Sequence, residues 1–162
     1  MPPLSTENSV LAKAVGSVSR DDGIAAEALD PGQGVVHTSG GYAAAGADSR
    51  TCRVAREQRN PGSRGIEDNE SPLEKPWAAN NNVETLGLRS HDQARLLLAY
   101  ADVDGDQTDD TYTEGTEVGW NANGYLEVLD GTPTVAIGRI VQEDSVTLSN
   151  GDNPVHVLVE FY

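Results

Sequence analysis

The stretch that decides the fold is Glu117-Val118-Gly119-Trp120-Asn121-Ala122-Asn123-Gly124-Tyr125-Leu126-Glu127-Val128-Leu129. Its two ends, Glu117–Trp120 and Tyr125–Leu129, are short runs rich in apolar and aromatic residues, which is typical of β-strands. Between them, the Asn123-Gly124 pair supplies the positive φ that a tight hairpin turn needs. We therefore predict an antiparallel β-hairpin at this point in the chain.

The segments on either side of this hairpin also have β character. In Val155–Tyr162 every second residue from Val155 to Phe161 is apolar, so this strand is expected to bury one face. Asp130-Gly131 and Ser149–Pro154 have the composition of turns. Further strands are predicted at Val10–Val18, Gly34–Thr38, Thr51–Ala55, Thr134–Val141 (with Gly138 as a candidate bulge) and Val146–Leu148.

No alternation of strands with helices is visible, so a parallel sheet is not expected. The predicted fold class is all-β: a small antiparallel β-barrel or sandwich with a long loop excursion and little helix. Residues 1–162 are expected to form a single domain. Within it, 1–9 is expected to be a flexible N-terminal arm, and 58–76, rich in Gly, Pro, Asn and charge, a long loop.

One segment is compatible with either a helix or a strand. Ser90-His91-Asp92-Gln93 matches a capping box, and Ala94–Ala101, which follows it, is made of good helix formers. A helix of this length is only marginally stable without packing. The residues alone therefore leave both structures open.

The composition is strongly acidic. The chain has 26 Asp and Glu against 11 Lys and Arg, a net charge of −15, and its only lysines are Lys13 and Lys75. Such a domain repels itself in ordinary buffer, but at molar salt the Debye length shrinks to about 3 Å. The composition therefore favours a protein adapted to a salt-saturated cytoplasm over an ordinary acidic protein.

Several classes of protein are not expected from the sequence. High salt removes most of the counterion-release contribution to nucleic-acid binding. The longest strongly apolar run, Leu96–Ala101, is too short to span a membrane, and Met1–Ser9 lacks the features of a secretory signal. Cys52 is the only cysteine, which excludes an internal disulfide.

Recognisable catalytic motifs are absent, and His37, His91 and His156 show no metal-ligand spacing, so an enzyme is not expected.

An acidic run is a candidate calcium site. Asp102, Asp104 and Asp106 alternate along the chain and Asp110 follows, which gives a hard cation several oxygen ligands. In the helix-loop-helix calcium motif the sixth position is Gly and the twelfth is Glu, whereas here Gln107 and Thr113 stand there. The alternative is a solvated acidic loop of a salt-adapted protein.

A basic cluster stands out against the negative charge. Five of the nine arginines fall within fifteen residues: Arg50, Arg53, Arg56, Arg59 and Arg64. Arginine pairs with carboxylates in a bidentate manner and is enriched at interfaces, so this cluster is a candidate docking patch for an acidic partner. The alternative is that these arginines pair with carboxylates of the same chain.

A series of short motifs runs along most of the chain from about Val15. The main ones are Arg20-Asp21-Asp22-Gly23-Ile24-Ala25, Ala28-Leu29-Asp30-Pro31-Gly32, Arg53-Val54-Ala55-Arg56-Glu57, Trp77-Ala78-Ala79, Ser90-His91-Asp92-Gln93-Ala94-Arg95-Leu96-Leu97, Tyr112-Thr113-Glu114-Gly115-Thr116-Glu117-Val118 and Val135-Ala136-Ile137-Gly138-Arg139-Ile140. In these motifs the sequence resembles the head decoration, or capsid-cementing, proteins of tailed viruses, including those of haloarchaea. Where the family pattern has Gly-Asp before two strands, this chain has Asn81-Asn82 and His91-Asp92.

The resemblance implies a small β-barrel on the outer capsid surface, bound to the major capsid protein, often trimeric and without catalytic residues. It also implies that Gln93–Tyr100 is a strand. The expected location is the virion, with the host cytoplasm as the place of assembly. A calcium-dependent β-rich surface or binding module of a haloarchaeon is the alternative, and a small hydrolase or nucleotide-processing barrel with a site between subunits is a third possibility.

Overall fold

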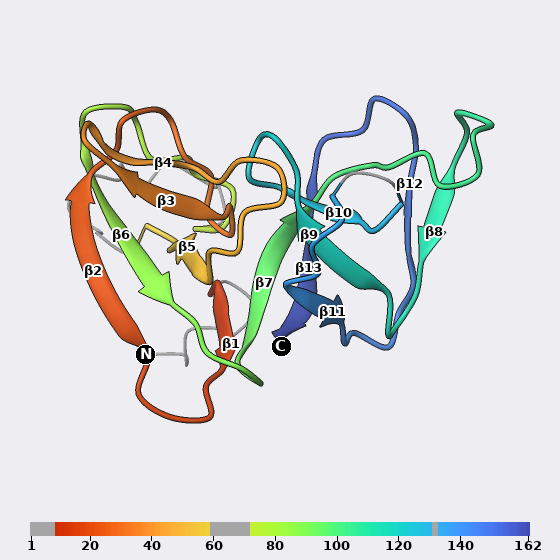
Figure 1. Ribbon diagram of the computed structural model, residues 1–162, viewed down its shortest axis with the longest axis horizontal. Coiled ribbons are helices and arrows are strands. Elements are labelled where there is room, and N and C mark those ends of the chain that lie inside the picture. Colours follow the sequence, from red (N-terminus) through yellow and green to blue (C-terminus); the bar gives the residue numbers. More distant parts are fainter. Residues whose placement is uncertain (1–8, 59–71, 131–132) are drawn as a thin grey trace.

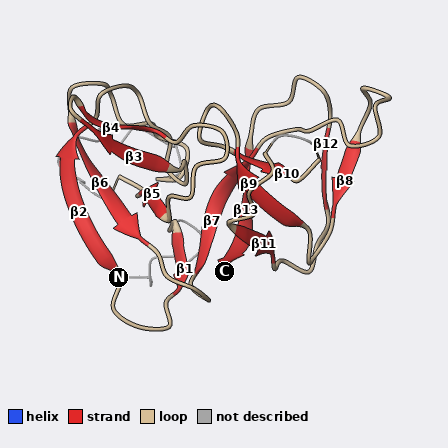
Figure 2. Ribbon diagram, viewed as in Figure 1, coloured by secondary structure: helices blue, strands red, loops and turns tan. Residues whose placement is uncertain are grey.

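The computed structural model describes residues 9–58, 72–130 and 133–162, and within these ranges all regular structure is β-strand (Figures 1 and 2). The predicted all-β fold class with a barrel is confirmed. The strands are β1 Leu11–Lys13, β2 Ser19–Ile24, β3 Val35–Thr38, β4 Gly41–Ala44, β5 Arg53–Ala55, β6 Asn82–Gly87, β7 Gln93–Leu98, β8 Asp110–Tyr112, β9 Glu117–Trp120, β10 Leu126–Val128, β11 Gly138–Ile140, β12 Val146–Leu148 and β13 Val155–Phe161.

The central feature is a closed barrel of five strands in the order β7-β10-β9-β11-β13, with β13 pairing back onto β7. β13 and β7 are antiparallel through six residue pairs, from Val155 opposite Leu98 to Glu160 opposite Gln93. The β10–β7 pair is parallel, and the other pairs of the barrel are antiparallel. Closure removes the free edges that a sheet of these short strands otherwise exposes.

The alternation of the terminal strand is confirmed. Val157, Val159 and Phe161 are at most 1% exposed and point into the barrel, whereas His156, Leu158 and Glu160 on the other face are partly exposed. The facing strands add Leu96, Leu98, Val118, Trp120, Leu126 and Ile140 to the interior. Burial of each large apolar side chain contributes about 1.5–3 kcal/mol. The barrel interior is therefore a packed core.

A second, smaller part of the fold lies beside the barrel (Figure 1). It contains the sheet β2-β6-β5 and the β3–β4 hairpin, and its core is formed by Ala25, Leu29, Val35, Tyr42, Ala55 and Val83. Gly34 joins the two parts, because its N–H donates to the Gly124 carbonyl and its carbonyl accepts from the Ala45 N–H. A Cβ at Gly34 would lie 2.8 Å from the Trp120 ring, so this close approach requires glycine.

The hairpin prediction is confirmed in detail. β9 and β10 pair antiparallel, and Gly124 has φ 71°. The Asn121 side chain accepts hydrogen bonds from the N–H groups of Asn123 (2.9 Å) and Tyr125 (3.1 Å). The turn is therefore fixed by its own side chains as well as by its glycine.

Two predicted strands are less than half as long as expected, and several others are shorter by one or two residues. Of Val10–Val18 only β1 is a strand, because the chain bends at Val15 and Gly16. Of Thr134–Val141 only β11 is a strand, since the N–H groups of Thr134 and Val135 donate to the Asp48 carboxylate instead of to a neighbouring strand.

The prediction of a bulge at Gly138 is wrong. Gly138 pairs in regular register with Phe161 on one side and Val118 on the other. Glycine is needed for a different reason, because a Cβ at this position would lie 2.3 Å from the Glu160 carbonyl oxygen. The small residue allows the close approach of β11 and β13.

The segment that was compatible with a helix or a strand forms β7, so the strand expected for Gln93–Tyr100 is confirmed over Gln93–Leu98. Most of the proposed N-terminal arm, residues 1–8, and most of the proposed long loop, residues 59–71, lie outside the described residues. Three strands were not predicted, β2, β4 and β8, and β6 was implied only by the strand that follows Asn81-Asn82 in the family pattern.

Candidate functional site

The five arginines of the cluster differ in exposure and in partners, and two of them are not described by the structure. Arg59 and Arg64 lie outside the described residues, and Arg50 is exposed. Arg53 lies across the β5–β6 pair, where its guanidinium donates to the Thr85 hydroxyl (3.0 Å) and the Ser19 hydroxyl (3.4 Å). Of the three members of the cluster that the structure describes, only Arg50 is exposed.

Arg56 pairs with two carboxylates of its own chain. Its Nη1 lies 2.8 Å from Glu84 Oε2, and its Nε lies 3.5 Å from Glu57 Oε1. The Arg56 side chain is 14% exposed and that of Glu57 only 1%. Glu57 Oε2 also accepts a hydrogen bond from the Val10 N–H, which anchors the start of the described chain. For Arg56, this arrangement is the internal pairing that the sequence left open as the alternative to docking.

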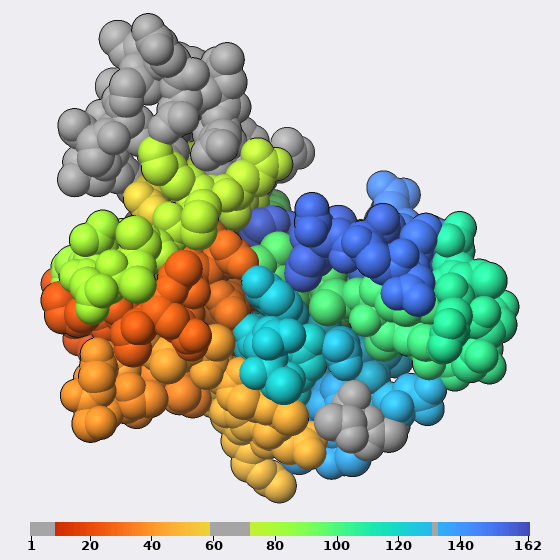
Figure 3. All heavy atoms as spheres, turned by 90° about the horizontal axis from the view of Figure 1, so that it is seen from above, coloured from red at the N-terminus to blue at the C-terminus, as the bar shows by residue number. Residues whose placement is uncertain are grey.

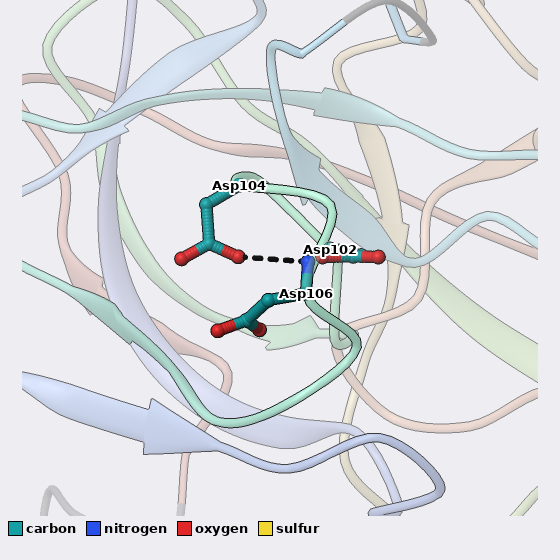
Figure 4. A group of neighbouring side chains, drawn as sticks. All are labelled: Asp102, Asp104 and Asp106. Carbon is teal, nitrogen blue, oxygen red and sulfur yellow. Dashed lines mark hydrogen bonds between the residues drawn. The ribbon is translucent and has the colours of Figure 1, made fainter.

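The acidic loop brings three of its four predicted ligands together (Figure 4). The carboxylates of Asp102, Asp104 and Asp106 supply oxygens that all lie within 4.8 Å of one another. Asp110 is outside this group and instead accepts a hydrogen bond from the Val103 N–H (3.1 Å). The loop thus gathers carboxylates as a hard cation requires, with one fewer than the sequence suggested.

The loop accommodates Gln107 at the position where the calcium motif has Gly. Gln107 has φ 60°, the left-handed backbone that glycine normally provides at the sixth position of a calcium loop. Its N–H and that of Gly105 both donate to Asp102 Oδ1, at 3.3 and 2.9 Å. The loop therefore adopts the turn despite the side chain. Thr113, at the twelfth position, is exposed and supplies no carboxylate.

The electrostatics of this loop show the crowding of its charges. A hydrogen bond from the Asp106 N–H lowers the pKa of Asp104, but desolvation and the Asp106 carboxylate outweigh it and the pKa is raised. Hydrogen bonds from the Thr108 hydroxyl and N–H lower the pKa of Asp106. A bound cation would offset this repulsion between neighbouring carboxylates.

A groove that sequence reasoning missed lies where the smaller part of the fold meets the barrel. It has a volume of about 700 Å³ and is lined by Asp30, Leu73, Glu74, Leu97, Tyr125, Asn153, Pro154, Val155 and His156. In Figure 3 the lime, cyan and blue segments that carry many of these residues meet around a hollow. Leu97 and His156 are direct cross-strand partners on the outer face of β7 and β13.

Two hydrogen bonds set the chemistry of the groove. The Tyr125 hydroxyl donates to Asp30 Oδ2 at 2.7 Å, and burial together with this carboxylate raises the pKa of Tyr125 to about 12. His156 Nε2 lies 2.8 Å from the Pro31 carbonyl oxygen, so this nitrogen carries the proton. Burial lowers the pKa of His156, which keeps the imidazole neutral near pH 7.

The sequence contained little signal for this groove. Its lining residues come from five separate segments, and only the outward position of His156 in the alternating last strand was visible beforehand. Cys52 is exposed, and desolvation raises the pKa of its thiol.

Comparison with known proteins does not identify a family. No protein-family profile matches this sequence, and no curated protein matches it significantly. In the described part of the chain there is no helix with the length and apolar character needed to cross a membrane.

Proposed function

We propose that this chain is a structural virion protein that decorates and stabilises the capsid of a halophilic tailed virus. The observation that carries the proposal is a packed, closed barrel combined with a strongly acidic chain. A barrel filled by its own side chains suits a mechanical role better than the carriage of a ligand in its interior. The sequence motifs that resemble decoration proteins support the same role.

The proposed mechanism is multivalent reinforcement. Many copies bind across the junctions between major capsid subunits, and each adds interface area. A single contact contributes little, but a repeated lattice and a homotrimeric protein raise the effective affinity. Arg50 is the described member of the arginine cluster that is exposed, and it is the first residue to test for contact with the capsid.

The backbone at His91 is compatible with the family pattern. His91 has φ 68°, a conformation that favours glycine, at the position where that pattern has Gly. The following Asp92 is 1% exposed, and its carboxylate accepts from the N–H groups of Val15 and Arg89 at 2.8 Å each. Of the two departures from Gly-Asp, the one at His91-Asp92 is therefore a change of residue at a position with a glycine-like backbone.

The test is to purify virions from a halophilic host and to quantify this chain against the major capsid protein. A copy number close to that of the major capsid protein is expected, as is a trimer by light scattering in molar salt. Absence of the chain from virions that are otherwise complete would overturn the proposal.

A calcium-dependent surface or binding module remains the second candidate. It is favoured by the convergence of Asp102, Asp104 and Asp106 and by the left-handed backbone at Gln107. Purified virions that lack the chain, together with a calcium-dependent melting temperature, would favour this function over decoration.

A further inference from the structure

The groove between the two parts of the fold offers mainly hydrogen-bond acceptors. Asp30 Oδ2 accepts from Tyr125, whereas Asp30 Oδ1 has no hydrogen-bond partner among the described residues. Because His156 Nε2 donates to Pro31, its Nδ1 is left as an acceptor. Glu74 adds a second carboxylate to the lining, and among the described residues no Lys or Arg belongs to it.

Apart from Asn153, the rest of the lining is apolar and consists of Leu73, Leu97, Pro154 and Val155. A ligand that fits this groove therefore combines a group rich in hydrogen-bond donors with an aliphatic portion. Guanidinium has five N–H donors and no acceptor, and the arginine stem is aliphatic.

A single metal ion fits less well. In the part of the chain that the structure describes, the one set of three ligand groups whose atoms lie within 4.8 Å of one another is Asp102, Asp104 and Asp106. Asp30, Glu74 and His156 are therefore too dispersed to surround one small cation together. Their separation suits a planar, extended cation with several donors.

We propose that this groove receives an arginine side chain from a partner protein. The guanidinium binds at Asp30 Oδ1 and the His156 imidazole, and the stem packs against Leu97 and Pro154. Arginine is favoured over lysine because its guanidinium is less strongly hydrated and forms directed, paired hydrogen bonds. The identity of that partner as a capsid subunit rests on the proposed function, but the arginine chemistry of the groove does not.

The experiment is a titration of the isotope-labelled full chain with N-acetyl-arginine amide in molar KCl, followed by NMR. The control probe is N-acetyl-citrulline amide, which has nearly the same shape without the charge. We expect saturable shifts of the Leu97, Tyr125 and His156 amide signals with the arginine probe, and at least tenfold weaker binding of the citrulline probe. Equal binding of the two probes, or the absence of saturable shifts at these residues, would overturn the inference.

Amino-acid substitutions test which residue of the groove binds the arginine probe. Asp30→Asn should weaken the binding of the arginine probe by about tenfold, which corresponds to about 1.4 kcal/mol of binding free energy. Asp144→Asn, the same change at an exposed position in the turn between β11 and β12, should leave binding unchanged. Unaltered binding by a folded Asp30→Asn protein contradicts the proposal, and if this variant does not fold, the two-probe comparison still decides.

The experiments can refute the arginine-binding inference and the proposed function independently of each other. If the probe does not bind while the chain is abundant in virions, the groove inference is wrong and decoration stands. If the probe binds while the chain is absent from virions, the arginine site stands and its partner is not a capsid.

Discussion

Replacement of Arg56 by Gln separates a docking role from a structural role for the arginine cluster. Arg56 is 14% exposed and lies between Glu84, at 2.8 Å, and the buried Glu57, at 3.5 Å. Without the guanidinium, the Glu57 carboxylate keeps the hydrogen bond from the Val10 N–H but loses its opposite charge in this pair. The variant is therefore expected to unfold more easily than the wild type.

The expected loss of folding stability depends on how deeply the ion pair of Arg56 and Glu57 is buried. Breaking a buried ion pair by removing one partner costs about 3–5 kcal/mol. Arg56 retains some contact with water and its second partner, Glu84, is 50% exposed, which lowers the expected loss to about 2–4 kcal/mol. For a chain of 162 residues this loss corresponds to a melting temperature lower by roughly 4–16 °C.

The assay is thermal and urea unfolding followed by circular dichroism in molar KCl. Arg50→Gln is the matched control, because Arg50 is exposed and has no side-chain partner among the described residues; its stability should change by less than about 0.5 kcal/mol. In the Arg56→Gln and Glu57→Gln double variant, part of the loss should be recovered, since the buried carboxylate at position 57 is replaced by a neutral amide. An Arg56→Gln protein as stable as the wild type would refute the reasoning, and Arg56 would again be a docking candidate.

Three further predictions concern the whole chain and its loops. Structure measured by circular dichroism should be lost as salt falls from molar to about 0.1 M, where the Debye length grows to about 10 Å; full stability at low salt without divalent cations would contradict the halophile interpretation. Added Ca²⁺ should raise the melting temperature by mass action, and Asp104→Ala should abolish that rise; an unchanged wild-type melting curve would leave the loop as a solvated acidic run. His91→Gly should stabilise the fold by about 1 kcal/mol by relieving the backbone at φ 68°, as measured by urea unfolding; a loss of stability would mean that the 3.7 Å contact of His91 with Glu160 outweighs the strain.

Local patterns in the sequence predicted the parts of the fold that local chemistry determines. The β9–β10 hairpin follows from Asn121 and Gly124, whose side chain and backbone define the turn. The burial of β13 follows from its alternation. β2 had no such signal, because its sequence is Ser-Arg-Asp-Asp-Gly-Ile and it pairs with β6, some sixty residues away. Its contacts, such as the hydrogen bond from the Tyr42 hydroxyl to Asp21, join segments distant in the sequence.

The helical signal at Ser90–Gln93 failed for a physical reason. Asp92 uses its carboxylate on the Val15 and Arg89 N–H groups, so it fixes a turn and ties it to the N-terminal segment. The following residues then pair with β13 through six positions and bury Ala94, Leu96 and Leu98. Tertiary pairing and burial outweigh the small differences in helix propensity between these residues.

The candidate sites, like the fold, could be predicted only where local sequence determines the structure. The spacing of the acidic run placed Asp102, Asp104 and Asp106 correctly in one loop, because neighbours at alternate positions in a tight loop necessarily lie close together. Clustering along the sequence did not predict the local contacts of the described arginines, since Arg53 lies across its sheet and Arg56, which follows β5, pairs with two carboxylates. The groove depends on contacts between segments as distant as Asp30 and His156, which no local pattern encodes.

The groove and the barrel core share one structural determinant, the register of β13 against β7. The pair Val157 and Leu96 points into the barrel, and the adjacent pair His156 and Leu97 points outward and lines the groove. A slip of one residue would exchange the two faces, so the hydrophobic core that fixes the register also fixes the groove. A site built on the outer face of a closed barrel is held more rigidly than one on a loop. Arginine binding and folding should therefore be lost together as the salt concentration falls, whereas the acidic loop at Asp102–Asp106 lies outside this paired register and can change without altering the groove.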